Sequence, residues 1–140
     1  MAPIEEYKGK KISYFYYEDG IAIYYIKRKG KLYCGNAKCH PEDGSKRSKF
    51  FGLDLAKFRA ELAVLKAARN EKIIEIKDFI KFRNAMSCDK RYNKDMDSIA
   101  RHQVNVKYKE LAKINLAIEN KERTIRMMIK NANKIKGKED

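Results

Sequence analysis

Two cysteines and a histidine lie close together within residues 33–44, in the stretch YCGNAKCHPEDG. Cys34, Cys39 and His40 are potential metal ligands, and Asp43 adds a carboxylate nearby. Tetrahedral zinc binds thiolate, imidazole and carboxylate groups, and a short spacing between two cysteines lets both thiolates reach one ion. The sequence therefore offers a candidate zinc site made of Cys34, Cys39, His40 and Asp43.

The same stretch is compatible with a turn that holds no metal. The gap between the two cysteines is at the edge of the spacing found in zinc sites, and a second ligand pair is missing unless Cys88 or His102 supplies it. Pro41 fixes its own φ and removes a donor, so a regular strand or helix does not continue through this point. In that case Cys34 is a core strand residue and His40 is a hydrogen-bonded turn residue.

The residues before this stretch have the pattern of β-strands. Residues 12–17 are rich in aromatic residues, residues 18–20 end in an Asp-Gly turn signal, and residues 21–27 form a second apolar run. A further turn at residues 28–31 leads into a third run that begins at Leu32. This order predicts a three-stranded antiparallel β-meander, with residues 1–10 as a loose lead-in.

Most of the nine tyrosines lie in this N-terminal part and alternate with Lys and Arg. Exposed aromatic rings can stack on bases while neighbouring cations hold phosphates. Alternatively, the tyrosines are half-buried strand residues, because aromatic side chains favour pleated surfaces. The candidate binding residues of this part and of the following loop are Tyr14, Tyr16, Tyr24, Arg28, Lys46 and Arg47.

Helical periodicity begins after the Cys/His stretch and continues almost to the end of the chain. Asp54 is a credible first-turn residue of a helix. We expect this helix to contain about 34 residues and to be about 50 Å long, at a rise of 1.5 Å per residue. A polar loop follows at residues 88–97. A last helix is expected to begin near Asp97. Its apolar stripe, with Lys121 as the one polar intrusion, is Val104, Leu111, Ile114, Ile118, Ile125, Met128, Ala132 and Ile135.

Spacings of three and four residues over several heptads predict an antiparallel, coiled-coil-like helical hairpin. The expected fold is therefore α+β, a single domain over residues 1–140 in which residues 1–51 hold the meander and the Cys/His joint. Residues 52–140 hold the helical hairpin, which ends in a short charged tail. A helix-mediated dimer is a further expectation.

The chain is strongly basic, with 33 Lys and Arg against 19 Asp and Glu, a net charge of +14 over 140 residues. Such a charge attracts polyanions such as nucleic acid or a ribonucleoprotein, although a lysine-rich face can also be merely solvated. No apolar run is long enough to cross a bilayer, so we expect a cytoplasmic protein without membrane contact. The candidate basic residues of the last helix are Lys113, Arg123, Arg126 and Lys130.

One hairpin resembles the core of GIY-YIG nucleases, whose two strands carry tyrosines and whose second strand ends in Tyr-x-Gly. The resemblance rests on Ile23-Tyr24 and on residues 30–35, GKLYCG, and Arg59 could take the role of that family's arginine. Ala22 interrupts the first triplet, Cys34 replaces the usual Ile, and no later Glu stands out as the metal-binding carboxylate. The resemblance implies a degenerate nuclease.

A second resemblance covers residues 33–60. The residues YCGNAKCHPED, followed by Ser48, Gly52, Ala56 and Arg59-Ala60, are similar to a signature of small proteins from phages and prophages of low-GC Gram-positive bacteria. That pattern is Tyr-x-Gly-x-Ala-x-Cys-His-Pro-x-Asp, and some proteins of this kind are anti-CRISPR inhibitors of type II effector nucleases. The resemblance implies phage origin, work in the cytoplasm of the bacterial host, and Cys39, His40 and Asp43 as the metal-ligand positions.

Three functional hypotheses follow, in order of preference. The first is a non-enzymatic phage-type inhibitor, an anti-CRISPR protein that docks on a CRISPR effector nuclease or its guide RNA complex and blocks nucleic-acid loading. The second is a basic DNA- or RNA-binding regulator, whose affinity would fall steeply with salt. The third is the degenerate nuclease, for which a magnesium-binding carboxylate set is not visible in the sequence.

Overall fold

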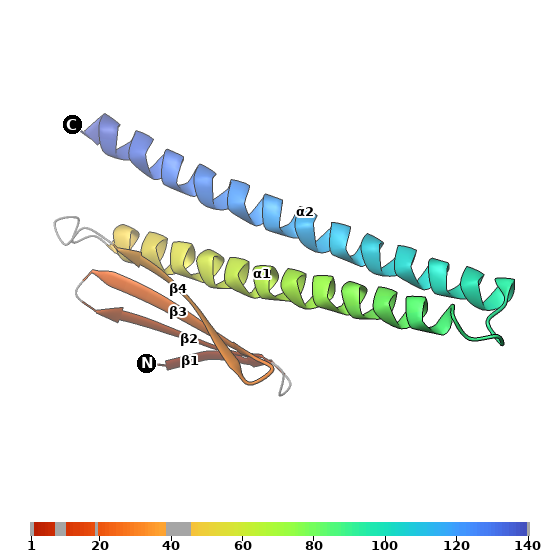
Figure 1. The fold of residues 1–140 in the computed structure, drawn as a ribbon. Coiled ribbons are helices and arrows are strands. Elements are labelled where there is room, and N and C mark those ends of the chain that lie inside the picture. The colour runs from red at the N-terminus through yellow and green to blue at the C-terminus, as the bar shows by residue number, and fades with distance from the viewer. Residues whose placement is uncertain (1, 8–10, 19, 39–45, 140) are drawn as a thin grey trace. The chain divides into compact units, whose positions relative to one another are not determined.

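The computed structural model describes residues 2–7, 11–18, 20–38 and 46–139, and it describes the side chains of Phe15 and of residues 20–38 and 51–132. Four strands precede two long helices, which confirms the α+β class (Figure 1). The strands are β1 (Ala2–Tyr7), β2 (Lys11–Glu18), β3 (Ile21–Arg28) and β4 (Lys31–Lys38). The helices are α1 (Lys46–Met86) and α2 (Lys94–Glu139).

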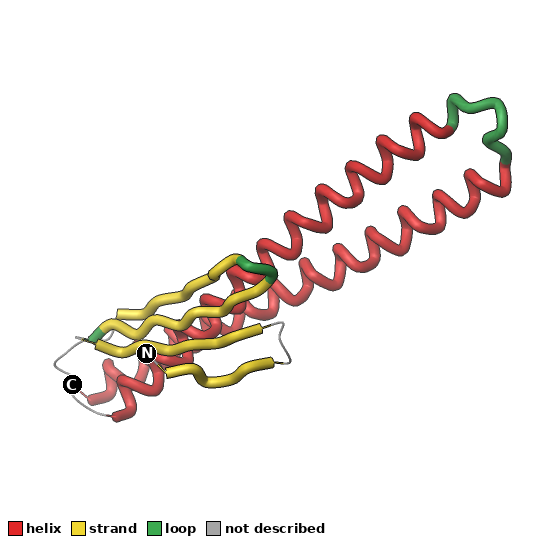
Figure 2. Tube along the Cα trace, turned by 90° about the horizontal axis from the view of Figure 1, so that it is seen from below, coloured by secondary structure: helices red, strands yellow, loops and turns green. Residues whose placement is uncertain are grey.

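The strands form one antiparallel sheet in chain order, β1-β2-β3-β4 (Figure 2). Turns join the last three strands where the sequence predicted them, and Gly20, Lys29 and Gly30 in these turns have positive φ. The expected three-stranded meander is not confirmed, because β1 adds a strand where a loose lead-in was expected. Its register with β2 shifts between Pro3 and Glu5. β1 lies at the sheet edge, where a proline is tolerated.

The chain divides into two compact units, and both helices contribute to each. The first, here named the sheet unit, comprises Met1–Leu65 and Glu119–Asp140. The second, here named the hairpin unit, comprises Lys66–Ile118. The expected boundary at residue 52 therefore does not separate these units, and the expectation of a single domain stays a prediction.

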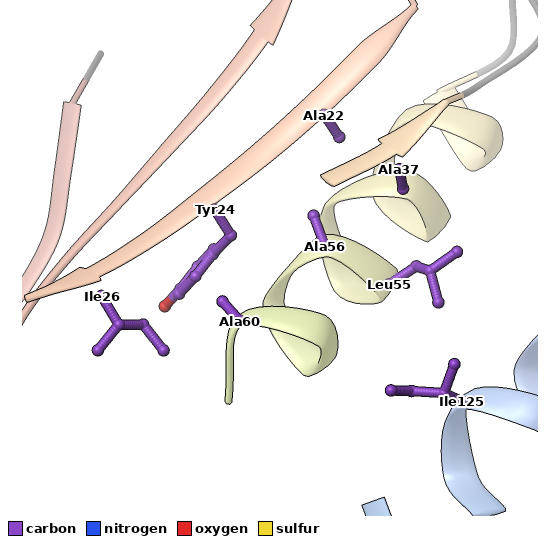
Figure 3. Close-up of a cluster of buried hydrophobic side chains, with 8 residues drawn as sticks. All are labelled: Ala22, Tyr24, Ile26, Ala37, Leu55, Ala56, Ala60 and Ile125. Carbon is purple, nitrogen blue, oxygen red and sulfur yellow. The ribbon is translucent and has the colours of Figure 1, made fainter. Parts of the chain in front are cut away.

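The core of the sheet unit lies between one face of the sheet and the helices. Alternate residues of β3 point into it, namely Ala22, Tyr24 and Ile26 (Figure 3). Across the β3–β4 ladder, Ala22 is paired with Ala37, and Tyr24 with Gly35. The helices contribute Leu55, Ala56, Ala60 and Ile125 to the same cluster.

Helix α1 begins at Lys46, earlier than the start near Asp54 that the sequence predicted. Gly52 therefore lies inside the helix, although glycine costs about 1 kcal/mol relative to alanine at such a position. Gly52, Ala56 and Ala60 recur every four residues, and all three are buried. Residues four apart share a helix face, so this face of α1 is smooth and lets another backbone come close.

Gly35 of β4 uses this smooth face. A Cβ atom on Gly35 would lie 2.2 Å from the carbonyl oxygen of Ala56 and 2.4 Å from the backbone nitrogen of Ala60. Beside this contact, the Arg59 guanidinium donates a hydrogen bond of 2.7 Å to the carbonyl of Asn36. The strand and the helix thus meet backbone to backbone, and only glycine fits at position 35.

The hairpin unit contains the turn between the helices, residues 87–93, which Figure 2 shows in green. Asn93 caps α2: its side-chain oxygen accepts a hydrogen bond of 2.9 Å from the Met96 backbone nitrogen. The Asn93 carbonyl accepts another, of 3.0 Å, from the backbone nitrogen of Asp97. Such a cap satisfies donors that the first helical turn leaves unpaired, and it starts α2 three residues before the predicted start.

Asp97 is the centre of a polar cluster at this turn. It accepts hydrogen bonds from the Tyr92 hydroxyl at 2.6 Å and from Arg83 at 3.2 Å, and it forms an ion pair with Arg101 at 2.8 Å. The Tyr92 hydrogen bond, followed by the charges of the two arginines, lowers the pKa of the Asp97 carboxyl. Because Arg83 belongs to α1 and Asp97 to α2, the cluster ties the ends of the two helices together.

Candidate functional site

The proposed zinc site falls largely outside the described residues, which exclude Cys39, His40 and Asp43. Its fourth candidate, Cys34, lies on β4 and is an exposed free cysteine. Among the residues that the structure describes, no three His, Cys, Asp or Glu side chains gather as a metal site. Cys88, named above as a reserve ligand, is also exposed and lies 3.6 Å from the Asn84 carbonyl. The zinc site stays a prediction.

The described part of the phage-type signature has a clear role in the fold. Gly35 and Ala37 lie on the buried face of β4, and Gly52, Ala56 and Ala60 form the smooth face of α1. These residues bring the strand and the helix into contact, as the distances from Gly35 show. The small residues of the signature are therefore explained by close contact between sheet and helix, and they need no ligand.

The predicted aromatic binding surface requires one correction. Tyr24 is only 7% exposed and belongs to the core between β3 and α1. Both faces of β3 are apolar in the sequence, so alternation alone could not show that Tyr24 points inward while Tyr25 lies on the other face. Tyr14 and Tyr16 lie on β2, where they pair in register with Tyr25 and Ile23, and their side chains are outside the described set.

The residues that resemble a GIY-YIG nuclease are also used within the fold. Tyr24 is buried, Gly35 lies against α1, and Arg59 donates to the Asn36 carbonyl. A catalytic tyrosine and arginine would need to reach a phosphate. These contacts account for the same residues without any substrate.

Two lysines of α2 occupy the apolar stripe between the helices. Lys121 lies 4.6 Å from the centroid of the Phe58 ring and 3.5 Å from the Glu61 carboxylate. The ammonium group thus receives both a cation–π contact and an ion pair. Lys121 was predicted as a polar intrusion, and its partners show how the stripe accommodates it.

Lys107 repeats this arrangement in the hairpin unit. It lies 5.5 Å from the centroid of the Phe79 ring and pairs with Glu75. Lys107 is not among the predicted site residues, although it lies two heptads before Lys121. This spacing of two heptads could have predicted that Lys107 lies on the same stripe of α2 as Lys121.

Glu75 lies between two lysines, because Lys72 also pairs with it at 2.9 Å. The hydrogen bonds from Lys107 and then from Lys72 lower the pKa of the Glu75 carboxyl to about 2. Lys72 also donates to Glu110 of α2 at 2.7 Å, and this bond is the main cause of its raised pKa. The cations of this group serve to join the helices.

The predicted basic residues near the end of α2 are different. Arg123 and Lys130 are exposed and have no ion pair with any residue that the structure describes. Arg126 is exposed and lies 4.0 Å from Glu122, the limit for an ion pair. At helical spacing these three residues lie on adjoining parts of one helix surface, here named the terminal patch (Arg123, Arg126 and Lys130).

The remaining predicted cations are spread over the chain. Lys113 is exposed on α2 in the hairpin unit, and Arg28 is half-buried at the end of β3. Lys46 and Arg47 lie in the first turn of α1, and their side chains are not among those described. The structure therefore brings together three of the predicted basic residues, those of the terminal patch.

Within the described residues, neither α1 nor α2 contains an apolar stretch long enough to cross a membrane. Comparison of the chain with protein families, with curated proteins and with solved structures found no match.

Proposed function

We propose that this protein is a non-enzymatic binding protein whose terminal patch docks on the phosphates of a nucleic acid or a ribonucleoprotein. The observation that carries the proposal is the separation of the cations of the helices into two groups. Lys72, Lys107 and Lys121 pair with acids inside the helical hairpin. Arg123 and Lys130 are exposed without such partners among the described residues.

The patch is compact enough to contact neighbouring phosphates. Arg123 and Lys130 lie seven positions apart, a rise of about 10 Å at 1.5 Å per residue, so all three cations lie within two turns of one helix surface. Each cation that neutralises a phosphate releases condensed counterions, and this favours binding at low salt. The net charge of +14 adds long-range attraction.

The most specific form of the proposal is an anti-CRISPR protein of phage origin that acts in the host cytoplasm. It is supported by the resemblance of residues 33–60 to small phage proteins together with the basic patch. In this form the patch docks on phosphates of the guide RNA in the complex and blocks loading of nucleic acid onto a type II effector nuclease. A basic DNA- or RNA-binding regulator is the alternative, and it uses the same patch on free nucleic acid.

A salt titration with a fluorescent oligonucleotide tests phosphate docking. The variant Arg123→Gln/Arg126→Gln/Lys130→Gln should weaken binding and reduce the slope of log K against log salt by about two to three between 50 and 200 mM salt. The control Lys27→Gln/Lys31→Gln/Lys57→Gln removes the same charge from exposed residues of the sheet unit. Equal losses in both variants would show non-specific attraction and would contradict docking by the patch.

A cleavage assay separates the anti-CRISPR form from the regulator. Preincubation with a type II effector nuclease and its guide RNA should prevent cleavage of target DNA, and the patch variant should lose this inhibition while the control variant keeps it. Binding of free DNA without any inhibition would favour the regulator. Cleavage of plain DNA or RNA that requires Mg²⁺ would contradict the non-enzymatic proposal and favour the nuclease.

Zinc content can be measured on protein purified without chelator. We propose one equivalent, lost together with thermal stability in Cys39→Ala and in His40→Ala. Lys38→Ala is the control, because it removes an exposed side chain at the end of β4, within the same stretch, without removing a candidate ligand. If the protein contains no metal and both variants are as stable as the parent, the Cys/His stretch of residues 33–44 is a turn without a metal site.

A further inference from the structure

Helix α2 carries a second stripe of residues at coiled-coil spacing in the hairpin unit. Its members follow one another at alternating steps of three and four residues, and all are exposed. They are here named the outer seam and are Ile99, His102, Val106, Lys109, Lys113 and Leu116. The apolar members are well exposed, with Ile99 at 62%, Val106 at 38% and Leu116 at 57%.

The outer seam is distinct from the stripe that faces α1. That inner stripe contains Val104, Lys107, Leu111 and Ile114, which are half-buried, and Ile118, which is buried. Residues shifted by two or five positions lie roughly on the opposite side of a helix with 3.6 residues per turn. A hairpin of two helices can cover only one of these seams, and α1 covers the inner one.

The inner stripe shows which chemistry satisfies a lysine in such a seam. Lys107 lies over the Phe79 ring and pairs with Glu75, so the facing helix supplies an aromatic surface and a carboxylate. Lys109 and Lys113 of the outer seam have no ion pair with any described residue. By the same chemistry, a helix that satisfies the lysines of the outer seam would carry large apolar residues and glutamates.

We propose that the outer seam docks an acidic amphipathic helix of a partner protein. Its apolar residues would cover Ile99, Val106 and Leu116, and its carboxylates would pair with Lys109 and Lys113 as Glu75 pairs with Lys107. Knobs-into-holes contact at a and d positions, with opposite charges on the flanks, is the ordinary basis of such pairing. This site uses different residues from the terminal patch and does not depend on the proposed function.

Charge and apolarity favour this occupant over two others. A second copy of the chain would bring two further lysines and no carboxylate to the shared seam, and the added like charge disfavours that pairing. A nucleic acid would satisfy the lysines but would leave Ile99, Val106 and Leu116 without an apolar partner. An acidic helix satisfies both parts of the seam.

The probe is a synthetic helix of about four heptads with Leu at a, Phe at d and Glu at e and g. A second peptide carries Lys in place of every Glu. Binding of each peptide to the full chain is followed by fluorescence anisotropy at about 150 mM salt, where distant charges are screened. We expect the acidic peptide to bind and the basic peptide not to bind.

Two pairs of matched variants locate the site. Ile99→Ser/Leu116→Ser and Lys109→Glu/Lys113→Glu should each weaken binding of the acidic peptide at least about tenfold, equivalent to about 1.4 kcal/mol. The controls on α1 are Ile74→Ser/Phe82→Ser, at 59% and 62% exposure, and the exposed lysine pair Lys77→Glu/Lys81→Glu. These should change binding less than about twofold.

Charge reversal gives the decisive result, since Lys109→Glu/Lys113→Glu should bind the basic peptide in place of the acidic one. The proposal is overturned if the native chain does not bind the acidic peptide, or if the control variants weaken binding as much as the seam variants. It is also overturned if sedimentation shows a dimer that Ile99→Ser/Leu116→Ser dissociates. An oligonucleotide could also displace the peptide and bind Ile99→Ser/Leu116→Ser as tightly as the native chain. That result would overturn the proposal in favour of phosphate binding.

Discussion

The sheet unit and the hairpin unit differ in the interactions that stabilise each of them internally. In the sheet unit, eight buried side chains from β3, β4, α1 and α2 form one cluster, and Gly35 lies against the backbone of α1. In the hairpin unit, the described side chains that are buried and apolar are Ile76 and Ile118. Ion pairs such as Lys72–Glu110 and Arg83–Asp97 join its helices at the edges of a half-buried stripe.

The two units illustrate two ways in which side chains specify how elements pack, by shape and by charge. Close contact between small residues fixes the position of β4 on α1 by shape, and any added atom disturbs it. Charged pairs fix which residues of the two helices face each other, yet each exposed pair contributes little free energy of unfolding. The sheet unit should therefore tolerate few substitutions, and the hairpin unit should tolerate many.

The largest effect is expected for Gly35→Ala. Its Cβ would lie within 2.5 Å of two backbone atoms of α1, so the strand or the helix must shift. We expect a loss of about 3 kcal/mol or more in the free energy of unfolding, measured by urea denaturation with circular dichroism.

Gly30→Ala is the matched control for Gly35→Ala. A Cβ on Gly30 has open space, but its φ of +76° is unfavourable for alanine, so we expect a loss of about 1 to 2 kcal/mol. A Gly35→Ala variant as stable as Gly30→Ala would contradict the close contact between β4 and α1.

Two buried isoleucines compare the units directly. Ile26 is 1% exposed in the sheet unit and Ile76 is 4% exposed in the hairpin unit. Ile26→Ala should cost about 3 kcal/mol, because the surrounding cluster leaves a cavity. Ile76→Ala should cost about 2 kcal/mol, because two helices can move together around the missing side chain. Equal losses by urea denaturation would show that the hairpin unit is as rigidly packed as the sheet unit.

A smaller effect is expected for the Lys107–Glu75 pair. In a double-mutant cycle of Lys107→Ala and Glu75→Gln, we expect a coupling free energy of about 0.5 kcal/mol, since the Glu75 side chain is 46% exposed. Raising the salt concentration should reduce it. A coupling of several kcal/mol that salt does not change would indicate a buried pair and would remove the contrast between the units.

The smallest effect is a dependence of stability on pH, because the Glu75 side chain is 46% exposed and solvent screens its interactions with the two lysines. The pKa of Glu75 falls from 4.5 to about 2 on folding, so its stabilisation is full above about pH 4.5 and is lost as the pH falls toward 2. In Glu75→Gln this contribution should be absent, and the difference in thermal midpoint between parent and variant should shrink over that range. An unchanged difference down to pH 2 would contradict the assigned partners of Glu75.

Much of the fold could be predicted because its signals are local. The Asp-Gly and Lys-Gly turns predicted the joints of β2, β3 and β4, and the heptad stripe from Val104 to Ile125 predicted which face of α2 is covered. Strand β1 was missed because Pro3 suggested a loop, whereas an edge strand accepts proline. The start of α1 was predicted too late because Asp54 is typical of a first helical turn, whereas the helix begins at Lys46 and continues through the buried Gly52.

The candidate site was harder to predict because its signals depend on contacts between distant segments. Alternation along β3 could not distinguish Tyr24 from Tyr25, because the inward face is set by the small residues of α1, which lie 28 to 36 positions after Tyr24. The basic residues of α2 look alike in the sequence. Only the positions of Glu61 and Glu75 show that Lys121 and Lys107 belong inside the hairpin while Arg123 and Lys130 remain outside.

The antiparallel pairing of the helices also has a consequence for folding kinetics. Arg83 and Asp97 are 14 positions apart, Glu75 and Lys107 are 32 apart, and Lys72 and Glu110 are 38 apart. Each pair that forms shortens the loop that the next pair must close, so the entropy cost of each step stays small. We expect the helices to pair from the Asn93 cap outward, which makes the turn the nucleus and the packing of Ile125 into the buried cluster of the sheet unit a late event.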